Sequence, residues 1–163
     1  RCVDTAALMI QGADGIHEVV NTHTIEIVEQ RLLVEPGSFV LDIQQAAPYF
    51  RQQGALGFIN SFVNNALPGM KHPITGVFDV LELLYHTHPT QHQGLSLAVS
   101  HDTIIAAIVA VISGQNQIEK SDWPEMMEGL FVWFEGEDFS NSKLKWIWRG
   151  QKQELVIKDF QNK

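Results

Sequence analysis

The sequence predicts an α/β fold: a mixed, mostly parallel sheet flanked by helices. Segments rich in β-branched residues alternate along the chain with segments of helical apolar spacing, as in strands joined by crossover helices. The last third instead has short alternating segments separated by turn residues, which indicates antiparallel pairing at the C-terminal edge. Since 45% of the 163 residues are hydrophobic and no repeat or linker interrupts them, residues 1–163 are expected to form one domain.

The first half of the chain is predicted to contain three helices and one strand. Apolar residues recur at helical spacing over residues 1–11, and β-branched residues over 25–34 predict a strand that ends at a Pro-Gly turn. The chain is then expected to be loop-rich until two amphipathic helices, over residues 55–67 and 74–86. We expect the helices to cover the faces of the sheet.

The second half begins with an apolar segment over residues 95–99, which is long enough for a buried strand. A second apolar segment, rich in alanine, isoleucine and valine, runs to Ile112 and is typical of a helix. Alternating and aromatic segments predict three further strands, joined by hairpin turns, over residues 129–134, 144–148 and 155–157.

Four consecutive polar residues separate the apolar segments around residue 100. Ser100-His101-Asp102-Thr103 stands where the predicted strand leads into the predicted helix. Ligands of open α/β sheets lie beyond the carboxyl ends of the strands, and the free N–H groups of a helix N-terminus suit an anion. We therefore expect an anion-binding site around His101 and Asp102.

The charge of the chain limits the partners that it can have. The formal net charge is −8, from 11 Lys and Arg against 19 Asp and Glu, so no basic patch is expected for nucleic acid. A small anion can still bind to one or two well-placed arginines. No apolar run reaches the roughly 18 residues of a membrane span, and the single Cys2 excludes an internal disulfide framework.

Three separated segments resemble one family. Arg1-Cys-Val-Asp-Thr-Ala6, Leu33-Val-Glu-Pro-Gly-Ser-Phe39 and Ser100-His101-Asp102-Thr103 are similar, in this order, to motifs of the histidine phosphatases, the phosphoglycerate-mutase-like clan. The resemblance covers residues 1 to about 135 and implies a phosphoglycerate-mutase-like domain. It implies hydrolysis of a phosphate monoester, in a small molecule or a phosphoprotein, through a phosphohistidine intermediate and without a metal or other cofactor.

The resemblance also implies a role for each motif residue. Arg1 would hold the phosphate through its forked donors, and His101 would be the second histidine, which donates to the transferring phosphoryl group. Asp102 would be the general acid that protonates the leaving alkoxide. The nucleophile of the family lies in an Arg-His-Gly motif on the first strand, and no Arg-His dipeptide occurs in this sequence. We therefore expect the N-terminal strand and its histidine upstream of residue 1, and this fragment alone to be inactive.

Val40 supports Asp102 as the acid. Members of the family that lack the His-Asp pair use a glutamate shortly after the Pro-Gly-x-Phe segment, where this chain has Val40. Because Asp102 must be protonated before it can act, an acidic pH optimum is expected. A mutase is disfavoured, since the mutase branch lacks the aspartate after its second histidine.

Two alternatives stay open at this point. The chain could be a catalytically inactive module that keeps the phosphatase fold and its phosphate pocket for binding or scaffolding. His101 could also be a buried histidine with a structural hydrogen bond, with Asp102 as a helix N-cap.

Other histidines, tryptophans and glutamates are given structural interpretations. His86, His88 and His92 could hold a metal, although a solvated loop is favoured because no carboxylate or cysteine lies nearby in the sequence. Glu125 and Glu128 are expected to be solvated. The tryptophans are expected to form sheet core and edge cover rather than a binding platform: Trp123, Trp133, Trp146 and Trp148.

Overall fold

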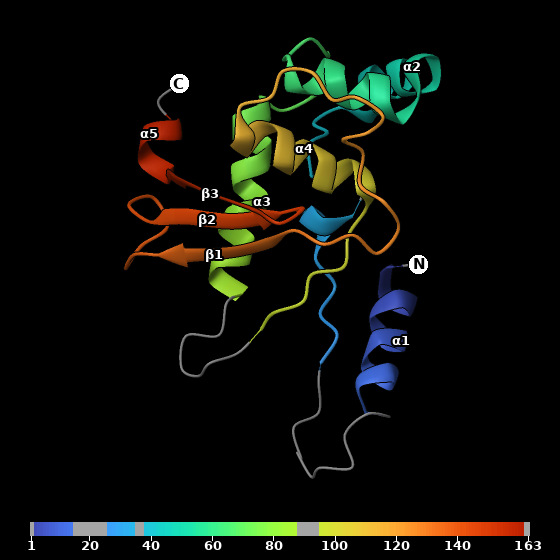
Figure 1. Cartoon of the computed structure of the whole chain (residues 1–163). Helices are drawn as coiled ribbons and strands as arrows, with labels where there is room; N and C mark the ends of the chain where they lie inside the picture. The colour runs from blue at the N-terminus through green and yellow to red at the C-terminus, as the bar shows by residue number, and fades with distance from the viewer. Residues whose placement is uncertain (1, 15–25, 35–37, 88–94, 162–163) are drawn as a thin grey trace.

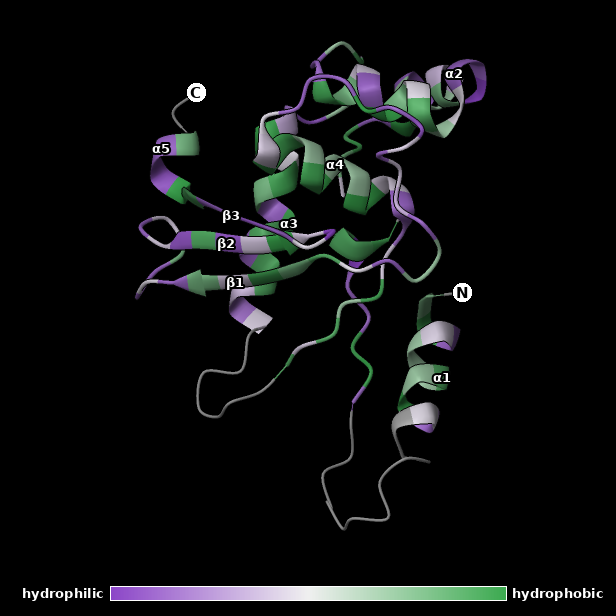
Figure 2. Ribbon diagram, viewed as in Figure 1, coloured by the Kyte–Doolittle hydropathy of each residue, from purple (hydrophilic) through white to green (hydrophobic). Residues whose placement is uncertain are grey.

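Helix α4 (Asp102–Ser113) is buried on nearly every side. Nine of its twelve residues are buried, and Figure 2 shows apolar residues along its whole length. A helix that is apolar all round has to be covered all round. Helices α2 (Ile43–Val63) and α3 (Pro73–Thr87) and the C-terminal sheet provide this cover (Figure 1). Gly114 ends the helix at φ 70°, a conformation that costs little without a Cβ atom.

The computed structural model describes residues 2–14, 26–34, 38–87 and 95–161. Within them the chain has mixed α/β structure, as predicted. The remaining elements are α1 (Cys2–Asp14), the 3-10 turn η1 (Arg31–Leu33), β1 (Phe131–Glu135), β2 (Lys143–Trp148), β3 (Gln151–Val156) and α5 (Ile157–Gln161). No helix of the described part is both long and apolar enough to cross a membrane.

Helix α2 begins earlier than the sequence predicts. The Asp42 carboxylate caps it by accepting hydrogen bonds from the N–H groups of Gln44 (2.9 Å) and Gln45 (3.3 Å). At Gly54 the backbone leaves helical geometry (φ 65°, ψ 179°), so α2 is two helical pieces joined at a kink. The prediction of a loop-rich region before residue 55 is therefore wrong, because the Asp42 cap and tertiary packing outweigh Pro48 and the glycines. The predictions of α1, α3 and α4 are confirmed.

The sheet has three antiparallel strands in the order β1-β2-β3. Leu144 and Trp146 point from β2 into the core and are fully buried, and Phe78 of α3 belongs to the same core. The indole N–H of Trp146 has no hydrogen-bond partner in the described part of the chain. The three C-terminal strands are confirmed, although Ile157 begins α5 instead of ending a strand.

The predicted mostly parallel sheet is not shown, because the segments expected to form two of its strands pair with no strand among the described residues. Residues 26–30 and 95–100 carry no regular secondary structure, and among the described residues no backbone hydrogen bond joins them. The backbone is nevertheless extended where each segment ends, at Gln30 (φ −124°, ψ 121°) and His101 (φ −109°, ψ 152°). A strand forms only where a second segment supplies N–H and C=O groups in register.

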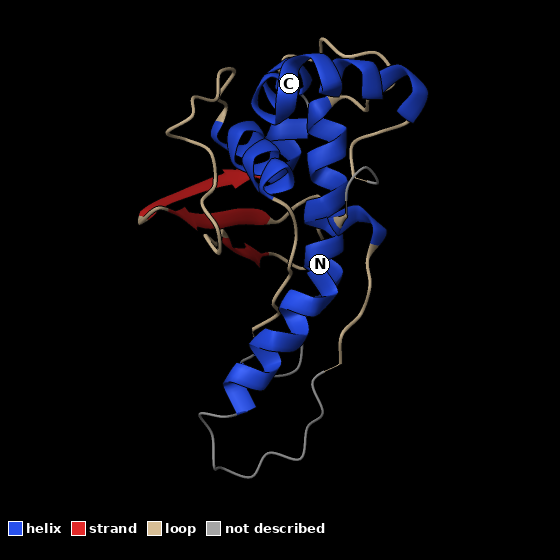
Figure 3. Cartoon of the chain, turned by 90° about the vertical axis from the view of Figure 1, so that its right-hand side faces the viewer, coloured by secondary structure: helices blue, strands red, loops and turns tan. Residues whose placement is uncertain are grey.

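Helix α1 lies next to the two extended segments and away from the other helices (Figures 1 and 3). The Ser100 hydroxyl donates to the Leu33 carbonyl at 2.8 Å and links the segments near their ends. Their aliphatic side chains are unusually open to solvent: Val28 is 62% exposed, Leu95 81% and Leu97 61%. These segments therefore form an uncovered apolar surface, unlike the packed region around α4.

The core around α4 can be tested at Leu81 of α3, which is fully buried. Replacing Leu81 with alanine is expected to lower the free energy of unfolding by about 2–5 kcal/mol, because the lost contacts leave a cavity. Urea denaturation measures the change. The control is Leu8→Ala on α1, where the leucine is 66% exposed and a change within about 0.5 kcal/mol is expected. Equal losses in the two variants would contradict the described core.

Candidate functional site

The start of α4 brings together three segments that are far apart in the sequence. The Cys2 sulfur of α1 lies 3.7 Å from the Ser100 carbonyl oxygen and 3.8 Å from His101 Nδ1. The Ser100 hydroxyl in turn donates to the carbonyl of Leu33, and the Ser38 hydroxyl donates to the carbonyl of Leu32. The three segments of the family resemblance therefore meet at one place, although 98 residues separate Cys2 from Ser100.

His101 is the N-cap residue of α4. Its carbonyl accepts hydrogen bonds from the N–H groups of Ile104 and Ile105, both at 3.1 Å, whereas its side chain makes no capping bond. The imidazole is half-buried, and the Cys2 sulfur lies 3.8 Å and 4.0 Å from its two ring nitrogens. The backbone of His101 thus starts the helix, while its ring lies beside Cys2 at the helix N-terminus.

Asp102 is the first residue of α4 rather than its N-cap, so the N-cap alternative is wrong. Its carboxylate is exposed and is held by two donors: the Thr103 N–H donates to Oδ1 at 2.8 Å and the Trp123 indole N–H donates to Oδ2 at 2.9 Å. A carboxylate at a helix N-terminus is favoured by the helix dipole. Each oxygen has two lone pairs, so each keeps one that these two donors do not use.

The other predicted site residues are not all placed. Arg1, the expected phosphate-binding arginine, lies outside the described residues, and so do His88 and His92. His86 is an exposed residue near the end of α3 and packs edge-on against Tyr85. Within the described residues no three His, Cys, Asp or Glu side chains are grouped so that they could hold a metal ion. The structure therefore brings together His101 and Asp102 and leaves Arg1 unplaced.

Trp123 is a site residue that the sequence reasoning missed. It was expected to be sheet core or edge cover, yet it lies in the loop before β1 and its indole nitrogen contacts Asp102 across 21 residues of sequence. Periodicity gives no signal for such a contact, since neither residue belongs to a strand pair or to the same helix. The only signal available was the Asp-Trp-Pro turn that contains it.

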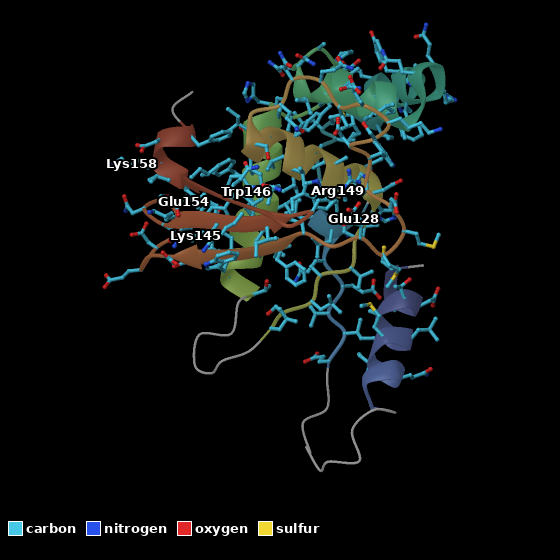
Figure 4. All side chains as sticks on the ribbon, in the orientation of Figure 1. Glu128, Lys145, Trp146, Arg149, Glu154 and Lys158 are labelled. Carbon is cyan, nitrogen blue, oxygen red and sulfur yellow. The ribbon has the colours of Figure 1, made fainter. Side chains whose placement is uncertain are left out.

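Arg149 holds the loop that carries Trp123. Its guanidinium donates to the carbonyls of Ser121 (2.6 Å) and Trp123 (2.9 Å). It also makes a two-pronged ion pair with Glu128, with nitrogen–oxygen distances of 2.7 Å and 2.9 Å (Figure 4). Arg149 (φ 46°) and Gly150 (φ 76°) form the tight turn between β2 and β3, so the hairpin aims the guanidinium at the loop.

The ion pair changes the titration of both partners. The Arg149 guanidinium and the Glu125 N–H, which both donate to Glu128, lower the pKa of Glu128 from 4.5 to about 2. The same carboxylate raises the pKa of Arg149. Glu128 is therefore paired, and the prediction that it is solvated is wrong.

Comparisons of the chain with protein-family models, with curated protein sequences and with solved structures found no match. The function therefore has to be inferred from the residues of the chain itself. Among the described residues, the candidate site consists of His101 and Asp102 at the start of α4. Cys2 contacts His101, and Thr103 and Trp123 donate hydrogen bonds to Asp102.

The Glu128–Arg149 ion pair predicts an acid-sensitive contribution to stability. Because the pKa of Glu128 is lower in the folded chain, the carboxylate stabilises the fold above pH 4.5, and this contribution is lost as the pH falls from 4.5 to about 2. After discounting for solvent screening, its size is about 1 kcal/mol. Glu128→Gln is expected to remove this pH-dependent part, as measured by urea unfolding at pH 2 to 7.

The control for this experiment is Glu125→Gln, which changes a neighbouring exposed glutamate that makes no described ion pair within 4.0 Å. It is expected to keep the acid-dependent loss seen in the unmodified chain. If Glu128→Gln also keeps that loss in full, the assigned ion pair is not what sets the pKa of Glu128.

Proposed function

We propose that this chain is part of a phosphate-monoester hydrolase that acts through a phosphohistidine intermediate, with the nucleophilic histidine upstream of residue 1. The observation that carries the proposal is the meeting of the three family-like segments at the start of α4. Ser100 contacts both Cys2 and Leu33 there, beside His101 and Asp102. Motifs that matched by chance would have no reason to converge on one helix N-terminus.

The proposed reaction has two steps. The upstream histidine attacks phosphorus while the P–O bond to the leaving alcohol breaks, and Asp102 gives its proton to the leaving oxygen. His101 donates to the phosphoryl oxygens, and the free N–H groups at the start of α4 add partial positive charge. Water then breaks the P–N bond, Asp102 takes back a proton, and phosphate leaves. Arg1 is proposed to hold the phosphate.

The proposal keeps the acidic optimum expected from the sequence, because a general acid has to carry a proton before it can act. The lone pair that each carboxylate oxygen of Asp102 keeps can hold this proton without displacing the Thr103 or Trp123 donor.

The two extended segments support the finer prediction of a mostly parallel sheet. Residues 26–30 and 95–100 run in the same direction in Figure 1, as parallel strands would. Their exposed Val28, Leu95 and Leu97 are suited to the faces of a parallel sheet, which helices cover. We propose that the strand with the nucleophilic histidine pairs with these segments and completes the sheet.

The roles of the two site residues predict different responses to the leaving group. In a protein that includes the upstream residues, Asp102→Asn is expected to lower kcat for an alkyl phosphate by about 10²–10⁴-fold. The loss for p-nitrophenyl phosphate should be much smaller, because p-nitrophenolate leaves without a proton. His101→Ala should lower both rates alike, by about 10²–10³-fold. Steady-state phosphate release measures these values.

The control is Asp159→Asn on α5, an exposed aspartate outside the site, which should leave both rates unchanged. Unchanged turnover in both the His101 and the Asp102 variants would overturn the mechanism. If the complete protein binds phosphate but turns over neither substrate, the chain is instead the inactive binding module.

The proposed strand predicts a change in amide hydrogen exchange. In the longer protein, the amides of Val28 and Leu97 are expected to exchange at least about tenfold more slowly than in this chain, since each would gain a backbone hydrogen bond. The amide of Ile108, which is already buried in α4, serves as the control. Equal exchange at Val28 and Leu97 in the two proteins would rule out the added strand.

A further inference from the structure

We propose that Trp123 is a positioning residue for Asp102 and that Arg149 holds Trp123 in place. The inference rests on the proposed function, because it concerns the orientation of the proposed general acid. In this proposal the loop before β1 and the β2–β3 hairpin help to orient the proposed general acid at the start of α4. Neither Trp123 nor Arg149 is expected to touch the substrate, so each acts through the next residue.

The contact with Trp123 fixes the carboxylate of Asp102. An exposed aspartate at the first position of a helix is otherwise free to rotate about its side-chain bonds. The Thr103 N–H binds only Oδ1, and a single hydrogen bond leaves the plane of the carboxylate undefined. The Trp123 indole N–H at 2.9 Å from Oδ2 adds a second fixed point from a different element. A general acid has to be held in this way, because a small misplacement of a reacting group costs much of its rate.

Trp123 can hold Asp102 only because its own loop is held. The Arg149 guanidinium donates to the backbone carbonyl of Trp123 at 2.9 Å and to that of Ser121 at 2.6 Å. Glu128 closes the arrangement by pairing with the other side of the guanidinium. One planar group thus binds two carbonyls and both oxygens of a carboxylate, which the single ammonium of a lysine cannot reproduce.

The charged groups around this arrangement are consistent with a fixed carboxylate. Arg149 is engaged by Glu128 and by carbonyls, so in the described geometry it does not form an ion pair with Asp102. The partner of Asp102 on this side is the neutral indole of Trp123. Since an indole N–H donates and cannot accept a proton, it orients the acid without competing for the proton that is transferred.

The first part of the test uses this chain and needs no activity. The chain has four tryptophans, so a ¹⁵N-labelled sample has four indole N–H resonances, and Trp123→Phe identifies the one from Trp123 by its loss. That resonance is expected to shift upfield and to exchange faster with solvent in Asp102→Ala, while the other three stay. Arg149→Lys should move it in the same direction. An unmoved Trp123 resonance in Asp102→Ala would overturn the assigned contact.

The second part measures the consequence in the protein that includes the upstream residues. Trp123→Phe is expected to lower kcat for an alkyl phosphate by about tenfold or more and to leave KM unchanged, because the acid is misplaced but the phosphate site is intact. The loss should be smaller for p-nitrophenyl phosphate, as for Asp102→Asn. In the Asp102→Asn background, Trp123→Phe should cause no further loss, since both act through one group. If Trp123 had only a structural role, Trp123→Phe would lower kcat for both substrates alike. Its effect would also add to the loss caused by Asp102→Asn.

Trp133→Phe is the matched control. Trp133 is a half-buried tryptophan of β1 whose ring faces Lys152 at 5.4 Å, and it makes no described contact with Asp102. The Trp133→Phe substitution should leave the Trp123 resonance unchanged, and kcat for both the alkyl phosphate and p-nitrophenyl phosphate should also stay the same. If the longer protein has no phosphatase activity, the proposed function fails while the resonance of Trp123 still decides the contact. If activity is present and Trp123→Phe keeps the full kcat for both substrates, the positioning role is overturned.

Discussion

The burial of α4 is the constraint on which the rest of the structure depends. A helix with isoleucine, valine or alanine at most positions has no face that can be left in water, so α2, α3 and the sheet all pack around it. The cover stops at the N-terminus of the helix, where His101 and Asp102 stand. The polar groups of the candidate site are therefore attached to a helix of which nine of twelve residues are buried, at the end where its first residue, Asp102, is exposed.

Arg149 connects the C-terminal hairpin to this end of α4. Most of the ion pairs of the sheet lie on its outer face, such as Lys145 with Glu135 and Lys143 with Glu154, and pairs of this kind contribute little to stability. Arg149 differs because it binds backbone carbonyls as well as Glu128 and thereby determines the position of a whole loop. Arg149 therefore matters more for the position of Trp123 than for the stability that its ion pair with Glu128 contributes.

The two extended segments show how far secondary structure depends on neighbours. Residues 95–99 are apolar enough for a buried strand, yet they form no strand because no described segment supplies backbone hydrogen bonds to them. Leu95 and Leu97 are exposed. The strands β1 and β2 are richer in aromatic and β-branched residues. The three C-terminal strands also pair with one another, and the short connections between them bring the partners together at low entropic cost.

The sequence by itself determined where α1, α3 and α4 form and where the polar residues interrupt the apolar segments, because helical spacing and capping are local properties. It was misleading over residues 43–53, since Pro48 and the following glycines weighed more in the local pattern than the single cap at Asp42. His101 and Asp102 could be predicted as a candidate site because they adjoin each other where one apolar segment ends and a predicted helix begins. Only the tertiary structure decided that Trp123 holds Asp102 and that Arg149 holds Trp123. The same is true of residues 26–30 and 95–100, which pair with no strand in the described part of the chain. The physical reason is that each of these depends on groups distant in the chain, whose meeting is set by the packing around α4 and not by any local preference.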